Sequence, residues 1–263
     1  MPSNRTGKTA LITGGSAGIG LALAREFAAH GHDLIVVARH RDALEAAAGT
    51  LEGKHGISAT VIALDLADAE SPQRLYDTVI GEGLKVDYLV NNAGFGLGGE
   101  FIETDIAREL DMIQVNVTAL THLTKLFLPA MVKRKQGRVM NVASTAAFQP
   151  GPLMSIYYAS KAYVLSFSQA IDEEVRRSGV TVTCLCPGPT ATDFAETSGV
   201  SNKGLLSSVV ADVDDIGRYG YAAMMRGERV AIPGRRNKLM IHAQRLAPRL
   251  LVTKISRIVQ ENR

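Results

Sequence analysis

The feature that most constrains the fold is a glycine-rich turn near the start of the chain, between an apolar run and a helix-like run. Residues Thr9–Thr13 have the composition of a buried strand, and 21–30 has that of a helix. The turn between them reads Gly14-Gly15-Ser16-Ala17-Gly18-Ile19-Gly20. Glycine lacks a Cβ, so a ligand can approach the backbone closely, and the helix that follows presents free N–H groups and the positive end of its dipole. We predict that this turn binds a pyrophosphate. A plain glycine-rich turn is the alternative, since the spacing fits the general dinucleotide fingerprint only loosely.

Strand-like and helix-like stretches alternate along the chain. The expected strands are 9–13, 33–38, 58–65, 86–91, 138–143, 180–186 and 229–233, and the expected helices are 21–30, 41–49, 69–80, 104–135 and 157–178. The strands are rich in Val, Ile and Leu without strict alternation, as in strands covered on both faces. This order predicts an α/β fold: one doubly wound, Rossmann-type domain with a mostly parallel seven-stranded sheet, helices on both faces and a C-terminal helical extension. We assign 1–234 to the dinucleotide-binding domain and 235–263 to the extension.

Polar residues and glycines follow the ends of five expected strands. They are Arg39, Asp65, Asn92, Ser144 and Gly188. In a doubly wound sheet, ligands bind beyond the carboxyl ends of the strands, where the winding direction switches. We therefore expect the functional residues to gather at that edge.

A tyrosine and a lysine lie four residues apart on the helix expected at 157–178. Tyr157 and Lys161 therefore share one helix face. A nearby ammonium group favours the phenolate and would lower the tyrosine pKa from about 10 towards neutrality, where a general acid or base is most effective. Tyr158 points elsewhere and is interpreted as a packing residue. A surface Tyr/Lys pair would give the same pattern.

Taken together, the motifs resemble those of the short-chain dehydrogenase/reductase family, over about residues 7–194. The matching elements, in family order, are Thr13-Gly14-x3-Gly18-Ile19-Gly20, Asn91-Asn92-Ala93-Gly94, Asn116, Ser144, Tyr157-x3-Lys161 and Pro187-Gly188-x-Thr190. The resemblance implies a catalytic tetrad of Asn116, Ser144, Tyr157 and Lys161.

The resemblance also implies a role for each member of the tetrad. Tyr157 would exchange a proton with the substrate oxygen, and Ser144 would hydrogen-bond that oxygen. Lys161 would bind the nicotinamide ribose and lower the tyrosine pKa. Asn116 would hold a water molecule that connects Lys161 to solvent.

The expected cofactor is NADP(H). After the second strand an acid usually binds the ribose hydroxyl of NAD, whereas cations bind the phosphate of NADP. Here Arg39 and Arg41 precede the first acid, Asp42, and a guanidinium can grip a phosphate bidentately. Some members carry a further basic residue where this chain has Ala17, so the preference rests mainly on Arg39. By resemblance, the cofactor residues are Gly14, Ser16, Gly18, Ile19, Gly20, Arg39, Asp65, Leu66, Asn92, Ala93, Gly94, Tyr157, Lys161, Pro187, Gly188, Thr190 and Thr192.

The expected function is NADPH-dependent reduction of a small ketone or aldehyde to an alcohol, or the reverse reaction. The alternative is a non-catalytic NADP(H)-binding sensor. Five apolar residues follow strands near the expected carbonyl site and favour an apolar substrate: Phe95, Phe148, Leu153, Met154 and Phe194. Loop packing would place such residues there equally well.

Other features of the sequence predict the compartment, the state of the cysteines, and the absence of a metal or a nucleic-acid partner. The start of the chain has no apolar signal core, so we expect a cytoplasmic protein. The six histidines show no metal-ligand spacing, and we expect no metal. Cys184 and Cys186 are expected to point to opposite faces of a strand, as buried reduced thiols. No nucleic-acid-binding motif accompanies the basic residues, so we expect no nucleic-acid partner.

The C-terminal tail is basic and amphipathic. Nine Lys/Arg and one acid lie in 229–263, and Pro248 predicts two short helices between residues 239 and 259. Their apolar residues are Leu239, Ile241, Leu246, Leu250, Leu251, Ile255, Ile258 and Val259. These faces would close over the substrate cleft or pack against a second subunit of a homo-oligomer, a dimer or a tetramer. Peripheral contact with an anionic membrane is the other interpretation.

Overall fold

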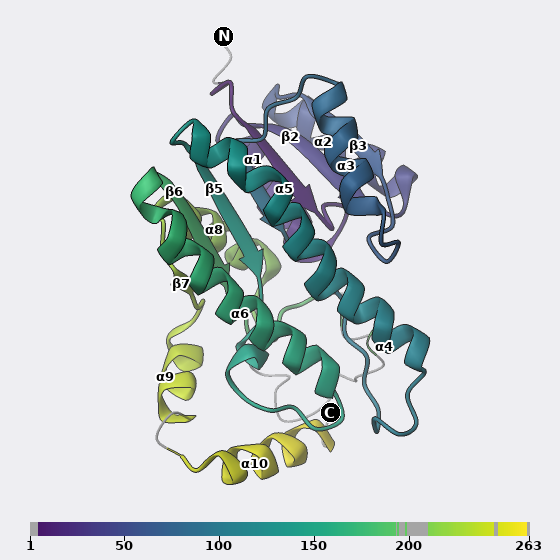
Figure 1. Cartoon of the computed structure of the whole chain (residues 1–263), viewed down its shortest axis with the longest axis vertical. Coiled ribbons are helices and arrows are strands. Elements are labelled where there is room, and N and C mark those ends of the chain that lie inside the picture. Colours follow the sequence, from purple (N-terminus) through teal and green to yellow (C-terminus); the bar gives the residue numbers. More distant parts are fainter. Residues whose placement is uncertain (1–4, 193, 195–197, 199–209, 245–246, 262–263) are drawn as a thin grey trace.

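A computed structural model describes residues 5–192, 194, 198, 210–244 and 247–261, and within them seven strands form one parallel sheet (Figure 1). The strands are β1 (Thr9–Thr13), β2 (Asp33–Ala38), β3 (Ala59–Ala63), β4 (Tyr88–Asn91), β5 (Gly137–Val142), β6 (Val180–Leu185) and β7 (Val230–Ala231). Their order across the sheet is β3-β2-β1-β4-β5-β6-β7, and every neighbouring pair is parallel. The doubly wound sheet expected from the sequence is confirmed.

Helices cover both faces of the sheet. They are α1 (Gly18–Ala29), α2 (Arg41–His55), α3 (Ser71–Gly81), α4 (Ile106–Ile113), α5 (Leu120–Lys133), α6 (Ser155–Val175), α8 (Val213–Met225), α9 (Arg235–Gln244) and α10 (Arg249–Glu261), with short turns η1 (Gln114–Ala119), η2 (Thr145–Phe148) and η3 (Arg176–Ser178). One core layer lies between the sheet and α1, α2 and α8, and the other between the sheet and α3 and α5. Leu11 and Ile12 point into opposite layers, as successive strand residues do. Both layers consist of buried apolar side chains, which explains the uninterrupted apolar runs.

The long helix expected at 104–135 is made of three pieces. Between α4 and α5, residues Gln114–Ala119 form a π-helical turn, η1. The run Ile106–Lys133 is long and apolar enough in composition to cross a membrane. Here, however, Leu123, Phe127 and Met131 are buried against the sheet. These three apolar residues of the run therefore belong to the hydrophobic core.

Helix α8 is an element that the sequence patterns above did not predict. Its interior contains Gly217 and Gly220, which are poor helix formers. A Cβ on Gly217 would lie 2.8 Å from the Cβ of Ala22 on α1, so the glycine allows the two helices to pack very closely. Asp212 caps the helix by accepting hydrogen bonds from the backbone N–H groups of Asp214 and Asp215, a local signal that could have located its start.

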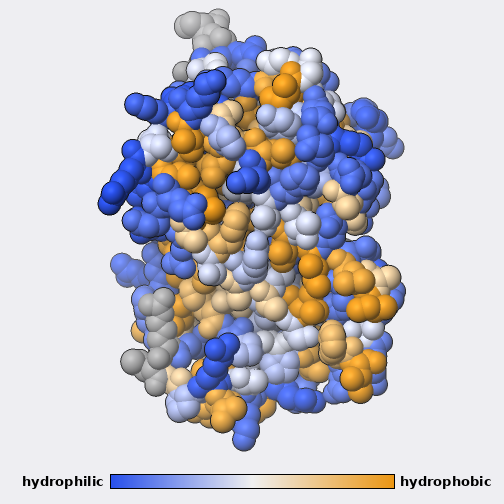
Figure 2. All heavy atoms as spheres, in the orientation of Figure 1, coloured by the Kyte–Doolittle hydropathy of each residue, from blue (hydrophilic) through white to orange (hydrophobic). Residues whose placement is uncertain are grey.

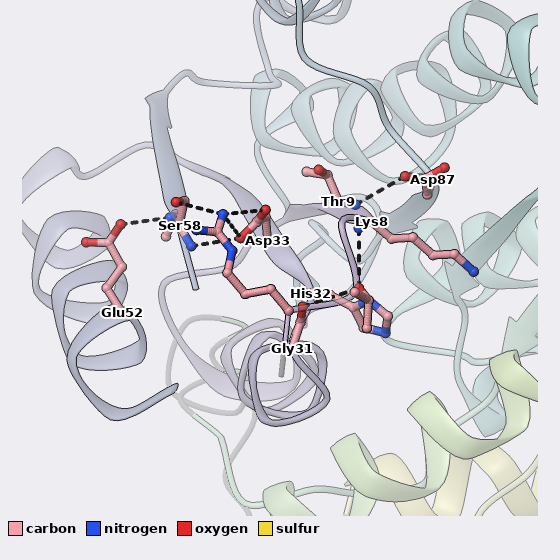
Figure 3. A network of polar contacts seen from close by, with 11 residues as sticks. Lys8, Thr9, Gly31, His32, Asp33, Glu52, Ser58 and Asp87 are labelled. Atoms are coloured by element: carbon pink, nitrogen blue, oxygen red, sulfur yellow. Dashed lines mark hydrogen bonds and ion pairs between the residues drawn. The ribbon is translucent and has the colours of Figure 1, made fainter. Parts of the chain in front are cut away.

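The end of the sheet remote from the glycine-rich turn contains a buried histidine (Figure 3). His32 is only 5% exposed, its Nδ1 lies 2.6 Å from Thr6 Oγ1, and its Nε2 lies 3.1 Å from Tyr221 Oη. Its ring also packs against Phe27 and Tyr88. Burial, with help from the positive charges of His30 and Lys8, lowers the His32 pKa from 6.5 to about 4.

His32 should make the stability of the protein depend on pH. Because the unfolded chain binds a proton at His32 near pH 6.5 and the folded chain only near pH 4, the free energy of unfolding should fall as pH drops from 6.5 to 4. The loss should total about 3 kcal/mol over that window. Urea unfolding across this range should show a flatter dependence for His32→Gln than for the exposed control His40→Gln. Equal slopes in the two variants would exclude His32 as the source.

Candidate active site

The glycine-rich turn lies between β1 and the first turn of α1 and forms a close backbone cradle. A Cβ on Gly20 would lie 2.0 Å from the backbone oxygen of Gly14, so only glycine fits there. The residue before α1 is Ala17, whose side chain cannot cap the helix, and its first N–H groups remain free of side-chain caps. This chemistry fits the pyrophosphate of a dinucleotide.

Hydrogen bonds join this turn to the end of β4, on the other side of the switch point. Thr13 Oγ1 accepts hydrogen bonds from the backbone N–H groups of Asn92 and Ala93, both at 3.0 Å. Asn92 Nδ2 donates to the carbonyl oxygens of Thr13 and Gly14, at 2.9 and 3.3 Å. Asn92 and Ala93 therefore support the turn. Their backbone N–H groups and Asn92 Nδ2 are hydrogen-bonded to Thr13 and Gly14.

The segment after β6 returns to the same turn. Thr190 Oγ1 donates to the carbonyl of Gly188 at 2.9 Å. A Cβ on Gly18 would lie 3.2 Å from Thr192 Cγ2, so Thr192 lies directly beside the turn. The Pro187 carbonyl accepts the N–H of Thr145 at 2.8 Å and ties this segment to the residues that follow β5. Residues predicted from three distant motifs thus share one edge of the sheet.

Tyr157 and Lys161 occupy neighbouring turns of α6. Lys161 Nζ lies 5.8 Å from the centre of the Tyr157 ring and donates to the Val142 carbonyl at 2.9 Å. The lysine is buried, and burial lowers its pKa from 10.5 to about 8. The shared helix face inferred from the four-residue spacing is therefore present.

Ser144 is the N-cap residue directly before η2 and lies two residues after the end of β5. Its Oγ accepts the N–H of Ala146 at 3.1 Å, which caps the short helix. This bond fixes the hydroxyl at the carboxyl end of the sheet, where α6 also begins. A hydroxyl can still donate while it accepts, so Ser144 can offer its proton to a substrate oxygen.

Asn116 lies in the π-helical turn η1. Its Oδ1 accepts the N–H of Phe95 at 3.1 Å, while its Nδ2 donates to the Phe95 carbonyl at 2.9 Å and to Ser160 Oγ at 3.1 Å. Such turns often occur at functional sites because they displace side chains from the regular helix register. A Cβ on Gly94 would lie 2.8 Å from Asn116 Oδ1 and 3.3 Å from Lys161 Nζ, which places these groups next to one another. The water expected on Asn116 stays a prediction.

A buried polar network below the site was missed in the sequence. Asn91 Nδ2 donates to Asn141 Oδ1 at 2.9 Å and to Thr124 Oγ1 at 3.0 Å, and Asn141 Nδ2 donates to Ser168 Oγ at 3.0 Å. The network connects β4, β5, α5 and α6. The signal was an asparagine at the same register position of two adjacent buried strands, which pair Asn91 with Asn141.

The five apolar candidates for the substrate pocket do not all lie together. Met154 is grouped with Tyr157, Tyr158 and Phe194, and the ring centres of Tyr157 and Phe194 are 5.2 Å apart. Phe148 instead lines a cavity of about 350 Å³ between α6, β7 and α9. The other two are Phe95, which lies under the Arg108 guanidinium, and Leu153, which adopts φ 65°.

The prediction for the two cysteines is wrong in part. Residues two apart in a strand point to the same face, and Sγ of Cys184 lies 3.7 Å from Sγ of Cys186. Both are free and buried, as expected. The contact with Cys184, together with burial, raises the pKa of the Cys186 thiol well above its ordinary value.

The residues expected to select the cofactor follow the carboxyl ends of β2 and β3. Arg39 is exposed directly after β2, and Arg41 forms a 3.5 Å ion pair with Glu45. Beyond β3, Asp65 accepts the backbone N–H of Ala67 at 3.0 Å, and Leu66 is buried. The expected ring of Arg39, Asp65 and Leu66 around an adenine site is compatible with these positions. The contacts themselves are predictions.

Comparison with known proteins agrees with this geometry. The family model described as "short chain dehydrogenase" matches residues 8–202. A 3-oxoacyl-(acyl-carrier-protein) reductase of Haemophilus influenzae is 34% identical over 217 residues, covering 82% of this chain and 86% of that protein. A very-long-chain 3-oxoacyl-CoA reductase of Anas platyrhynchos is 33% identical over 198 residues, and the match spans 73% of this chain but only 62% of that protein.

Solved structures show the same similarity. A short-chain dehydrogenase from Sphingobium yanoikuyae in complex with NADPH has a TM-score of 0.82 and 31% identity, covering 90% of this chain and 94% of that chain. A relative from Burkholderia phymatum in complex with NAD has a TM-score of 0.81 and 26% identity, covering 94% and 95%. One of these two neighbours is in complex with NADPH and the other with NAD. This chain belongs to the short-chain dehydrogenase family.

Proposed function

We propose that this protein is an NADPH-dependent oxidoreductase that reduces the carbonyl of a small apolar substrate to an alcohol, or catalyses the reverse reaction. The observation that carries the proposal is the position of Tyr157, with the buried Lys161 Nζ 5.8 Å from its ring, at the same sheet edge as the glycine-rich turn. The acid–base pair and the turn that would bind the dinucleotide therefore lie at the same edge of the sheet. A bound nicotinamide cofactor would supply the hydride.

The residues of the chain supply the proton and the orientation. Ser144 hydrogen-bonds the substrate oxygen and holds it next to the Tyr157 hydroxyl. Tyr157 donates its proton to that oxygen as the carbonyl is reduced, and accepts it in the reverse direction. The ammonium group of Lys161 stabilises the resulting phenolate. Asn116 fixes the Phe95 backbone beside them.

Substitution of the catalytic tyrosine tests the reaction directly. Tyr157→Phe removes the proton donor but keeps the ring, so kcat should fall about 10²- to 10⁴-fold while NADPH binding is retained. The measurement is loss of NADPH absorbance with a panel of long-chain 3-oxoacyl thioesters, aromatic ketones and sugars, and NADPH affinity by calorimetry. Tyr163→Phe, on an exposed part of the same helix, is the control.

Two results would contradict the proposal. Wild-type rates in Tyr157→Phe would remove the tyrosine from catalysis. If no compound of the panel were reduced although NADPH binds tightly, the non-catalytic sensor would be the better description.

The preference for an apolar substrate is supported by the group formed by Met154, Tyr158 and Phe194 around the catalytic tyrosine. It is also supported by the two relatives, whose names specify 3-oxoacyl groups. We therefore propose that the long-chain and aromatic members of the panel have the higher kcat/KM. Sugars that outcompete them would contradict this part of the proposal.

The preference for NADP rests on Arg39, which is exposed directly after β2, where no acid follows the strand until Asp42. A charge-assisted hydrogen bond contributes about 1.5–3 kcal/mol, so Arg39→Ala should weaken NADP(H) binding about ten- to a hundredfold. Binding of NAD(H), which lacks the phosphate, should hardly change and is the internal control. An equal loss for both cofactors would show that Arg39 does not recognise the phosphate.

The pH dependence of the reaction should reflect Lys161. Its pKa of about 8 means that the ammonium is present below pH 8 and is lost above it. Because carbonyl reduction uses the charged lysine and the protonated tyrosine, kcat/KM for reduction should fall as pH rises through about 8. In Lys161→Arg the guanidinium stays charged, so the residual activity should lose this break. The same break in both proteins would assign it to another group.

We also propose that the protein acts in the cytoplasm as a homo-oligomer. The exposed side chains of Ile106 and Leu110 on α4 support a subunit interface there. Analytical ultracentrifugation of the full chain measures the oligomeric state.

A further inference from the structure

The last helix of the described chain carries its apolar residues on the outside. In α10 the buried residues are the polar Ser256 and Gln260, whereas Leu251, Ile255 and Ile258 are exposed. Leu251, Ile255 and Ile258 therefore do not close over the cleft, whereas Ile241 of the same tail is buried. Val252 and Val259 are half-buried on the inner side, but the larger apolar side chains face outwards, unlike those of an ordinary surface helix.

The outward face is a continuous stripe. With a rotation of about 100° per residue, Leu251, Ile255 and Ile258 lie on one side of the helix, opposite Ser256 and Gln260. Lys254 lies on the flank of that stripe, and Leu250, 81% exposed, extends it. Figure 2 shows hydrophobic side chains beside hydrophilic ones at the lower end of the molecule, where α10 lies in Figure 1.

Specific contacts hold α10 in this orientation. Gln260 Nε2 donates to Tyr158 Oη at 2.8 Å, and Arg257 pairs with Glu100 at 3.2 Å. These contacts join the helix to the start of α6 and to the loop after β4. Because the polar face is bonded to the body of the protein, the apolar face cannot simply turn inwards.

Helix α9 carries a second group of exposed apolar and basic side chains. Ile241 anchors it in the core, while Leu239 and Met240 are exposed next to the exposed cations Arg236 and Lys238. Together α9 and α10 carry six Lys/Arg and one acid, Glu261, which is paired with Arg257. We call the following exposed residues of these two helices the tail surface: Arg235, Arg236, Lys238, Leu239, Met240, Leu250, Leu251, Lys254, Ile255 and Ile258.

A membrane with anionic lipids matches both properties of the tail surface. An amphipathic helix with cations beside its apolar stripe can bury that stripe among the lipid chains while the cations contact the headgroups. A symmetric contact with a second copy would bring the same patch against itself, so that Lys254 would face further cations. Charge complementarity therefore favours the membrane over self-association.

We propose that the tail surface docks this protein on the surface of an anionic membrane, with the outer faces of α9 and α10 at the headgroup level. Tyr158, bonded to α10, is the neighbour of Tyr157, and so the docked face lies on the side of the molecule that contains the catalytic tyrosine. The inference does not depend on which substrate is reduced. It concerns where the protein works.

Flotation of the full chain with vesicles tests the proposal. Wild-type protein should float with phosphatidylserine/phosphatidylcholine vesicles, and 0.5 M salt or pure phosphatidylcholine should largely abolish this. Ile255→Ser should lower the partition coefficient about tenfold or more, because a buried isoleucine is lost from the membrane. Lys254→Glu should lower it at least about fivefold. Circular dichroism and NADPH binding verify that each variant is folded.

Matched controls exist on the opposite part of the molecule. Ile80 on α3 is 52% exposed, the same as Ile255, so Ile80→Ser should leave flotation unchanged. Lys54, exposed on α2, serves as the charge control through Lys54→Glu. Wild-type protein that stays off anionic vesicles overturns the proposal, as does equal flotation of Ile255→Ser and Ile80→Ser. Self-association that is lost in Ile255→Ser, without vesicle binding, assigns the surface to a second copy instead.

Discussion

The hydrogen bonds between Thr13 and the Asn92-Ala93 backbone are the contact on which the site depends. They join the carboxyl ends of β1 and β4, the two strands between which the sheet changes its winding direction. At this point successive connections run to opposite sides, so the chain leaves an open crevice at the strand ends. Without a polar tie, the ends of two parallel strands would be free to separate there. Thr13 joins them with one hydroxyl, and no side chain of the glycine-rich turn takes part in these two hydrogen bonds.

A second set of buried polar contacts connects β4 and β5 to helix α6. Asn91 and Asn141 join β4 to β5, and Ser168 joins β5 to α6, which carries Tyr157 and Lys161. Buried polar groups are costly unless they are hydrogen-bonded, so such a network favours one register of the strands and one position of the helix. Tyr157 and Lys161 are thereby fixed relative to the glycine-rich turn through β4 and β5. Preorganisation of this kind is what an acid–base pair needs, because its geometry must be set before the substrate binds.

The sequence was sufficient to predict the sheet, its parallel order and the edge at which the site lies, since these follow from apolar periodicity and from residues local to the strand ends. What it could not predict depends on contacts between distant segments. Helix α8 contains two glycines that only make sense once α1 is packed against it. The π-helical turn at Asn116 and the position of Phe148 in a separate cavity likewise depend on tertiary packing. The two cysteines are a different case. The two-residue period of a strand is enough to predict that Cys184 and Cys186 point to the same face.

The tail shows how the same local signal can have opposite tertiary meanings. The periodicity of residues 239–259 correctly indicates two amphipathic helices, and α10 begins directly after Pro248. Periodicity, however, gives only the existence of an apolar face and not its direction. In α10 the direction is set by Gln260 and Arg257, whose partners Tyr158 and Glu100 lie far away in the sequence. These contacts join the polar side of α10 to the body of the protein, and the larger apolar side chains face outwards. Burial of this apolar stripe requires something outside the described fold.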